Sequence, residues 1–251
     1  MSKDGVPQPG VQVEQSEGGD GVRYLLHLPK NYTDKKKWPV LMFLHGMGER
    51  GSVLQTITAN GPPKILMADS PEAPVMSLME DFIVVSPQCP DTGVWFHFEK
   101  QVLAITDAVS ARFNGDADKT YLTGLSMGGY ATWRMASQMS NKWAAILPVC
   151  GGLAPMFGFS LDAVGSISPT LPIWTHHGDE DNVVPYADTV TIVDHLEQAG
   201  PKFRREAFAP RPKDFLSEPR IFTTHVGVGH DSWTPTYNDP EIYRWLLHWS
   251  R

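Results

Sequence analysis

Ser126 is the residue whose neighbours point most directly to chemistry. It lies in the hexapeptide GLSMGG at residues 124–129, directly after the run TYLT at residues 120–123 and directly before a helix-forming stretch. So sharp a turn from strand to helix leaves no room for Cβ atoms two residues before and after the serine, and Gly124 and Gly128 carry none. At a helix N-terminus, free N–H groups and the helix dipole favour developing negative charge. The pattern predicts a serine nucleophile, although glycine-rich helix starts also occur as simple tight turns.

A serine hydroxyl is a weak nucleophile near neutral pH, so Ser126 needs a base within hydrogen-bond reach, and the base needs a carboxylate to orient it. His230 is our candidate for the base, because it alone of the nine histidines lies in a glycine-flanked loop just past the last predicted strand. The loop HGDEDNVVP at residues 177–185 follows another predicted strand and offers Asp179 and Asp181 as the acid.

Five motifs follow one another along the chain: LHGMGERG at residues 44–51, SPQCP at 86–90, the elbow GLSMGG at 124–129, DNVVP at 181–185 and GHDSW at 229–233. Their order, with the nucleophile before the acid and the acid before the histidine, is that of the α/β-hydrolases. Together they resemble the single-domain carboxylesterases, and within these the phospholipase/carboxylesterase and feruloyl-esterase-like branch, which is related to the prolyl oligopeptidases. The similarity extends over about residues 38–250.

The resemblance implies roles for three further residues. It puts the orienting carboxylate at the first position of D-x-x-V-P, which is Asp181, with Asp179 as a rival that also fits a turn-forming role. It implies an oxyanion hole made of the backbone N–H groups of Met127 and Met47. The loop that carries Met47 also fits a simple strand-ending turn.

Strand and helix signals alternate along the chain, and they predict how these residues are positioned. We expect an α/β-hydrolase fold, with a mainly parallel central sheet, helices on both faces and catalytic residues at the carboxyl ends of the strands. Residues 1–20 are expected to be a loose lead-in with at most a short edge strand at residues 11–13, and residues 21–251 a single catalytic domain without a large lid. The predicted strands are residues 24–28, 40–44, 82–85, 120–123, 144–149, 173–176 and 220–226, and the predicted helices are about 98–113, 127–140, 185–200 and 239–249.

Composition and charge limit the classes of function. The chain has 251 residues with 41% hydrophobic and 20% charged side chains, as is typical of globular proteins, and no segment approaches the roughly 18 apolar residues of a membrane span. A net charge of −7 without a dense basic cluster argues against nucleic acid or an anionic membrane as a partner. Two cysteines do not make a disulfide framework, and the first residues lack the apolar segment of a secretory signal, so we expect a cytoplasmic protein.

Two tryptophans are candidates for binding substrate. Trp95 follows the central apolar strand and Trp233 lies beside His230 in the sequence, so both could wall an apolar pocket, and both could equally belong to the core. The apolar residues of the interval 151–171 are further candidates for the wall. The insertion at residues 51–80 is too long to be only a turn, and its role is open.

This chemistry requires no metal or organic cofactor, and the expected partner is a small-molecule ester. We predict a serine carboxylesterase that hydrolyses small or short-chain acyl esters, with hydroxycinnamoyl esters among the candidates. A thioesterase or peptidase of the same fold is one alternative, and a non-catalytic binding protein that keeps the fold is another. The presence of Ser126, Asp181 and His230 together argues against the last. The preference for esters or thioesters and the oligomeric state stay open.

Overall fold

A mixed sheet runs through the centre of the protein. The computed structural model describes residues 7–68, 73–210 and 213–251, and among these residues nine strands form one sheet with the order β1-β2-β4-β3-β5-β6-β7-β9-β8. The pairs β1/β2 and β2/β4 are antiparallel, and all other neighbouring pairs are parallel. The strands are β1 (Gln12–Gln15), β2 (Tyr24–His27), β3 (Trp38–Leu44), β4 (Ile83–Pro87), β5 (Gly115–Leu125), β6 (Ala145–Val149), β7 (Ile173–Gly178), β8 (Arg204–Ala207) and β9 (Arg220–His225).

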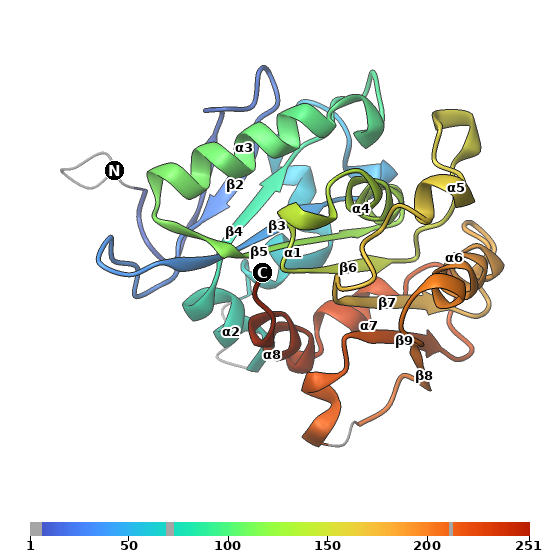
Figure 1. The fold of residues 1–251 in the computed structure, drawn as a ribbon. Helices are drawn as coiled ribbons and strands as arrows, with labels where there is room; N and C mark the ends of the chain where they lie inside the picture. Colours follow the sequence, from blue (N-terminus) through green and yellow to red (C-terminus); the bar gives the residue numbers. More distant parts are fainter. Residues whose placement is uncertain (1–6, 69–72, 211–212) are drawn as a thin grey trace.

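Helices cover both faces of this sheet, with α3 and α4 on one side and α2 and α8 on the other (Figure 1). The helix α6 packs with the first layer, and α1 and α7 with the second. The α-helices are α1 (Gly61–Ile65), α2 (Ala73–Asp81), α3 (Glu99–Arg112), α4 (Met127–Gln138), α5 (Leu161–Val164), α6 (Tyr186–Ala199), α7 (Trp233–Tyr237) and α8 (Pro240–His248). The 3-10 helices are η1 (Met47–Glu49), η2 (Leu54–Ala59), η3 (Trp95–His97), η4 (Ser140–Lys142), η5 (Pro155–Phe157) and η6 (Lys213–Ser217).

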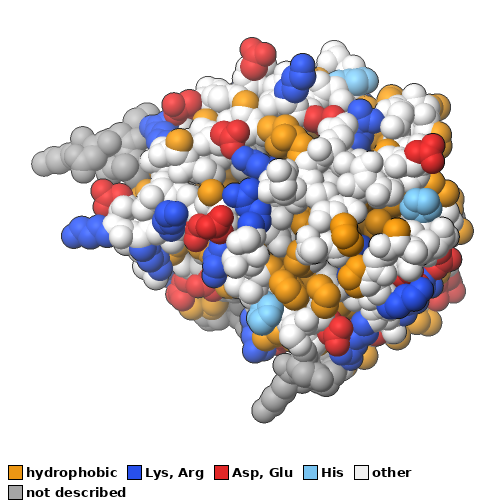
Figure 2. Space-filling view, viewed as in Figure 1, with side chains coloured by type: hydrophobic (Ala, Val, Ile, Leu, Met, Phe, Trp, Pro, Cys, Tyr) orange, Lys and Arg blue, Asp and Glu red, His pale blue; other side chains and the backbone are white. Residues whose placement is uncertain are grey.

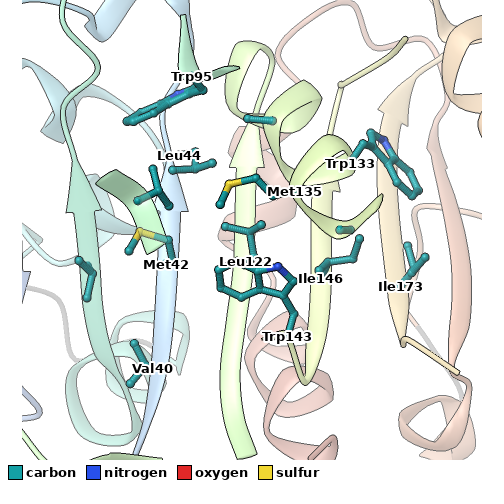
Figure 3. Close-up of a cluster of buried hydrophobic side chains, with 14 of the residues drawn as sticks. Val40, Met42, Leu44, Trp95, Leu122, Trp133, Met135, Trp143, Ile146 and Ile173 are labelled. Atoms are coloured by element: carbon teal, nitrogen blue, oxygen red, sulfur yellow. The ribbon is translucent and has the colours of Figure 1, made fainter. Parts of the chain in front are cut away.

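Alternate residues of the same strands build two separate cores. Met42 of β3 belongs to a cluster with α3, α4 and α6, whereas its neighbour Phe43 belongs to a second cluster with α1, α2 and α8. In the first cluster, Met135 of α4 lies over the strands beside Leu122 (Figure 3). Because both faces are buried, the central strands are continuous apolar runs, and this is why the sequence pattern indicated them.

The structure confirms the predicted fold class, with its mostly parallel sheet and two helical layers. The edge strand expected at residues 11–13 corresponds to β1, which begins at Gln12. Between β6 and β7 the chain contains only η5 and α5, so no lid domain is inserted there.

The strand β8 and the helix α7 are among the elements that were not predicted. The edge strand β8 has the polar sequence RREA, which gives no apolar signal, and it makes β9 the second strand from the edge. The helix α7 spans only five residues and includes a proline, so its helical pattern is too short to recognise.

Charged side chains of both signs are mixed over the face shown in Figure 2, where basic side chains form no continuous surface. None of the helices in the described residues is long and apolar enough to cross a membrane.

Candidate active site

Ser126 lies on a strained turn between β5 and α4, with φ 52° and ψ −117°. Its backbone N–H donates to the carbonyl of Val149 at 3.0 Å, which ties the turn to the end of β6. A Cβ atom on Gly124 would lie 2.4 Å from the carbonyl oxygen of Gly128, and one on Gly128 would lie 1.9 Å from the carbonyl oxygen of Leu44. The two glycines are therefore required by close backbone packing, as the sequence pattern indicated.

Three side chains meet in series at the carboxyl ends of β5, β7 and β9. The Nε2 atom of His230 lies 2.9 Å from Oγ of Ser126, and its Nδ1 atom lies 2.7 Å from Oδ2 of Asp181. Asp181 has a fully buried side chain, while 18% of the His230 side chain is exposed. The parallel order of the strands brings residues separated by about a hundred positions to one edge of the sheet.

Asp181 is held as a carboxylate by its donors. Its Oδ1 atom accepts hydrogen bonds from the backbone N–H groups of Val183 and Val184, both at 2.9 Å. Burial opposes ionisation, but the donors from His230, Val184 and Val183 outweigh it and lower the pKa of Asp181 below its usual value. A carboxylate at Oδ2 requires the proton on Nδ1 of His230, so the Nε2 lone pair can accept the hydroxyl proton of Ser126.

His177 gives Asp181 a second histidine neighbour that sequence reasoning did not assign. Its Nε2 atom lies 3.1 Å from Oδ2 of Asp181 and 3.0 Å from the carbonyl oxygen of Val184, and its Nδ1 atom lies 2.8 Å from the hydroxyl of Thr189. Burial lowers the pKa of His177, so the ring is neutral and donates its Nε2 proton to the carboxylate. Its position four residues before Asp181 was visible in the sequence, but its orientation was not.

The rival carboxylate Asp179 has a different position. It is exposed, and its Oδ1 atom accepts a hydrogen bond from the backbone N–H of Gly227 at 2.7 Å. It thereby joins the loop after β7 to the loop after β9, which carries His230, and it is Asp181 that contacts the histidine.

The loop after β3 packs directly against the serine. A Cβ atom on Gly46 would lie 3.7 Å from Cβ of Ser126 and 2.8 Å from Cδ1 of Leu125, so this backbone approaches the elbow closely. Met47 follows as the first residue of η1, and Met127 is the first residue of α4. The first N–H groups of a helix have no acceptor within it, which leaves such groups available to an oxyanion beside Ser126.

His45 anchors this loop from the core. Its Nε2 atom accepts a hydrogen bond from the backbone N–H of Cys89 at 2.9 Å, so the proton resides on Nδ1, which lies 2.6 Å from the carbonyl oxygen of Gly46. The indole N–H of Trp95 donates to the carbonyl of His45 at 2.9 Å. Burial lowers the pKa of His45 to about 4, so the ring is neutral at physiological pH.

A chain of contacts connects the loop after β3 with the loop that carries His230. Asn60 donates through its amide to Oε1 of the buried Glu49, and its own Oδ1 atom accepts from the indole N–H of Trp233 at 3.1 Å. The ring of Trp233 packs edge-on against His230 with centroids 5.2 Å apart. Asn60 belongs to the insertion at residues 51–80, and no motif in the sequence identified it as part of the site.

An apolar cavity of about 540 Å³ opens beside Ser126. Trp95 contributes to its lining, whereas Trp233 lies outside that lining and contacts His230 and Asn60 instead. The lining residues are Met47, Val94, Trp95, Phe96, Ser126, Met127, Tyr130, Leu153, Ala154, Pro155, Met156, Phe157, Val183 and Val184.

A serine on a strand-to-helix elbow, with an acid and a histidine after later strands of a doubly covered parallel sheet, defines an α/β-hydrolase. The chain matches the model of the phospholipase/carboxylesterase family over residues 31–210, and it belongs to that family.

Known proteins with similar sequences and folds agree with this assignment. The chain is 32% identical over 176 residues to the bifunctional acetylxylan esterase/xylanase XynS20E of Neocallimastix patriciarum, and the match covers 68% of this chain and 23% of that protein. Similar solved structures include a thermostable esterase, with a TM-score of 0.74, 28% identity and coverage of 96% of this chain and 63% of that one. A feruloyl esterase module from Clostridium thermocellum in complex with sinapinate has a TM-score of 0.67 and 21% identity, with coverage of 97% of this chain and 89% of that one.

Proposed function

We propose that this chain is a serine carboxylic-ester hydrolase that works through a covalent acyl-enzyme. The observation that carries the proposal is the continuous series of hydrogen-bond distances from Ser126 through His230 to Asp181, beside an open apolar cavity. The same residue types in the same series activate serine in unrelated hydrolases, so the geometry supports this reaction class beyond the family resemblance.

The reaction has two half-reactions. Oγ of Ser126 attacks the ester carbonyl carbon while Nε2 of His230 takes the hydroxyl proton, and the backbone N–H groups of Met47 and Met127 stabilise the oxyanion. The C–O bond to the alcohol breaks as His230 returns the proton to the departing oxygen. Water then attacks the acyl-serine and gives a proton to His230, and collapse releases the carboxylic acid and restores the serine hydroxyl.

Esters of small or short-chain acids are the substrates we propose, with hydroxycinnamoyl esters as a further class. The matched relative bears the name acetylxylan esterase, and one similar solved structure is a feruloyl esterase module with bound sinapinate. An apolar cavity suits both an alkyl and an aromatic acyl group. Neither the cavity nor the triad distinguishes an oxygen ester from a thioester, so a substrate panel must include both.

Replacing Ser126 with alanine tests the proposal. The Ser126→Ala variant should lose about 10⁴-fold or more of the hydrolysis rate for short-chain p-nitrophenyl esters, because no other group replaces the nucleophile. The exposed Ser52→Ala is the matched control and should keep the wild-type rate. The folded wild-type protein should also be labelled by a fluorophosphonate probe, and the Ser126→Ala variant should not.

Two results would contradict this function. A wild-type rate in the Ser126→Ala variant would mean that the nucleophile lies elsewhere. Absence of both labelling and turnover in folded wild-type protein would indicate a binding protein that keeps the fold without catalysis.

A further inference from the structure

One wall of the cavity is a short flap, defined here as residues 154–159. Ala154 and Phe159 pair through two backbone hydrogen bonds of 3.0 and 3.1 Å, and Gly158 closes the turn with φ +74°. Phe159 is completely buried, whereas Met156 at the tip is 86% exposed. Because residues 154–157 all line the cavity, the position of the flap determines its shape on that side.

Arg134 holds the flap from the helix that begins after the serine. It lies in α4, about two turns beyond Ser126, and its Nη1 group donates to the carbonyl oxygen of Phe157. Its Nε group donates to Oε1 of Glu99 at 2.6 Å, at the start of α3. The side chains of Arg134 and Glu99 are only 19% and 14% exposed, so solvent screens this ion pair less than a pair on the surface.

The same guanidinium also contacts a second aromatic residue of the cavity lining. Its Cζ atom lies 5.0 Å from the ring centroid of Phe96, within the range of a cation–π interaction. Phe96 in turn packs edge-on against Phe157, with centroids 5.3 Å apart. Phe96 and Phe157 both line the cavity, so Arg134 contacts two neighbouring residues of the cavity lining.

We propose that Arg134 is a positioning residue that sets the preference for esters with a long apolar group, by fixing the flap against Phe96. The proposal rests on the ester hydrolysis proposed above and names the part of the substrate that the flap recognises. The flap contacts an apolar group that extends from the ester into the cavity. An acetyl ester of a small alcohol fills only a small part of the 540 Å³ and does not depend on the flap.

Only arginine has the geometry for this role. The planar guanidinium group of arginine can donate to a carboxylate and to a carbonyl at the same time, while its face lies over an aromatic ring. A lysine at position 134 has a single ammonium group, which can pair with Glu99 without also holding Phe157 and covering Phe96.

Three small esters distinguish an effect on the recognition of a long apolar chain from an effect on ester hydrolysis in general. Ethyl acetate is the short reference, and the isomers ethyl hexanoate and hexyl acetate carry the same number of carbons with the long chain on the acyl or the alcohol side. Acid release in a pH-stat gives kcat/KM for each ester with wild type, Arg134→Ala and Arg134→Lys. Arg244→Ala is the control, because Arg244 also pairs with a glutamate but lies on α8, across the sheet from the flap.

We expect both Arg134 variants to lose about 10-fold or more in kcat/KM for at least one long ester, mainly through KM, while ethyl acetate hydrolysis is unchanged. The isomer that suffers the loss identifies which side of the ester lies along the flap. Met156→Ala, which removes an exposed side chain and should fold normally, is expected to show a smaller loss for the same isomer.

Two outcomes would overturn the proposal. One is an equal loss of kcat/KM for all three esters, which would mean that Arg134 affects the position of α4 and Ser126 and not the recognition of a long chain. The other is an unchanged ratio of kcat/KM between the long esters and ethyl acetate in Arg134→Lys and Met156→Ala, which would mean that the flap takes no part in substrate recognition. Failure of ester hydrolysis itself is distinct from both, because it would already be seen with ethyl acetate in wild type.

Discussion

At the scale of single residues, the carboxylate of Asp181 is the most constrained group of the site. Two backbone N–H groups reach its Oδ1 atom, and both His177 and His230 contact its Oδ2 atom. Four neighbours around one buried carboxylate leave it a single orientation. His230 therefore has a fixed partner, whereas its own side chain remains partly exposed.

Removing the second histidine should show how much this support matters. His177→Phe keeps a ring of similar shape but deletes the donor to Asp181, so we expect the free energy of unfolding to fall by about 2 kcal/mol and kcat/KM to fall about tenfold. Urea denaturation and short-chain ester turnover measure the two effects. His195→Gln on α6 is the control, and full activity in His177→Phe would show that the other neighbours suffice to orient Asp181.

At the scale of elements, the loop after β3 and the elbow after β5 are neighbours because the two strands pair in parallel register. Leu44 pairs with Gly124, so both strands end at the same level, and the backbone of Gly46 meets the serine directly. The buried ring of His45 holds this loop to the loop after β4. The backbone N–H groups proposed for the oxyanion hole are therefore positioned by strand pairing and by one neutral histidine.

Two glycines of this loop form a matched pair for a test. A Cβ atom on Gly46 would lie 2.8 Å from Leu125, whereas one on Gly48 would meet nothing within 4 Å. We expect Gly46→Ala to displace the proposed oxyanion donor and reduce kcat by up to about 100-fold, with Gly48→Ala close to wild type. Steady-state kinetics with a short-chain ester measures both, and equal rates for the two variants would contradict this account of the loop.

At the scale of the whole molecule, three of the buried histidines make the fold sensitive to acid. His27, His45 and His177 are almost completely buried, and burial lowers the pKa of each, to about 4 for His27 and His45. The unfolded chain binds protons at these sites near pH 6.5, whereas the folded protein does not. The contribution of His27 and His45 to stability is complete above pH 6.5 and is lost as the pH falls toward 4.

The pH dependence of the free energy of unfolding can reveal the contribution of one of these histidines. Between pH 6.5 and about 4, His27 and His45 each add a slope of up to about 1.4 kcal/mol per pH unit to the free energy of unfolding. His27 pairs with Val84 near the start of β4, whereas the candidate site lies at the carboxyl ends of the parallel strands, so His27→Gln should lose this share of the slope while keeping its activity. Urea unfolding at several pH values measures the difference. Parallel curves for wild type and His27→Gln would mean that His27 is protonated equally in both states.

The local sequence pattern was sufficient to predict an element where residues close in the sequence determine its structure. Gly124 and Gly128 around Ser126 indicated the elbow, because only glycine fits that turn, and apolar runs indicated the strands that both helical layers bury. The edge strand β8 was missed because its residues are polar and its pairing depends on β9, which a local pattern does not contain.

The sequence by itself determined the fold class, the candidate nucleophile and the order in which acid and base follow it, since these depend on spacing along the chain. Only the tertiary structure decided which groups touch. It brought Asp181 to His230 and left Asp179 exposed, placed Trp233 against His230 outside the cavity lining, and joined Arg134 to the flap. The physical reason is that such contacts depend on side-chain direction and on strand order, which bring together residues that no local pattern relates.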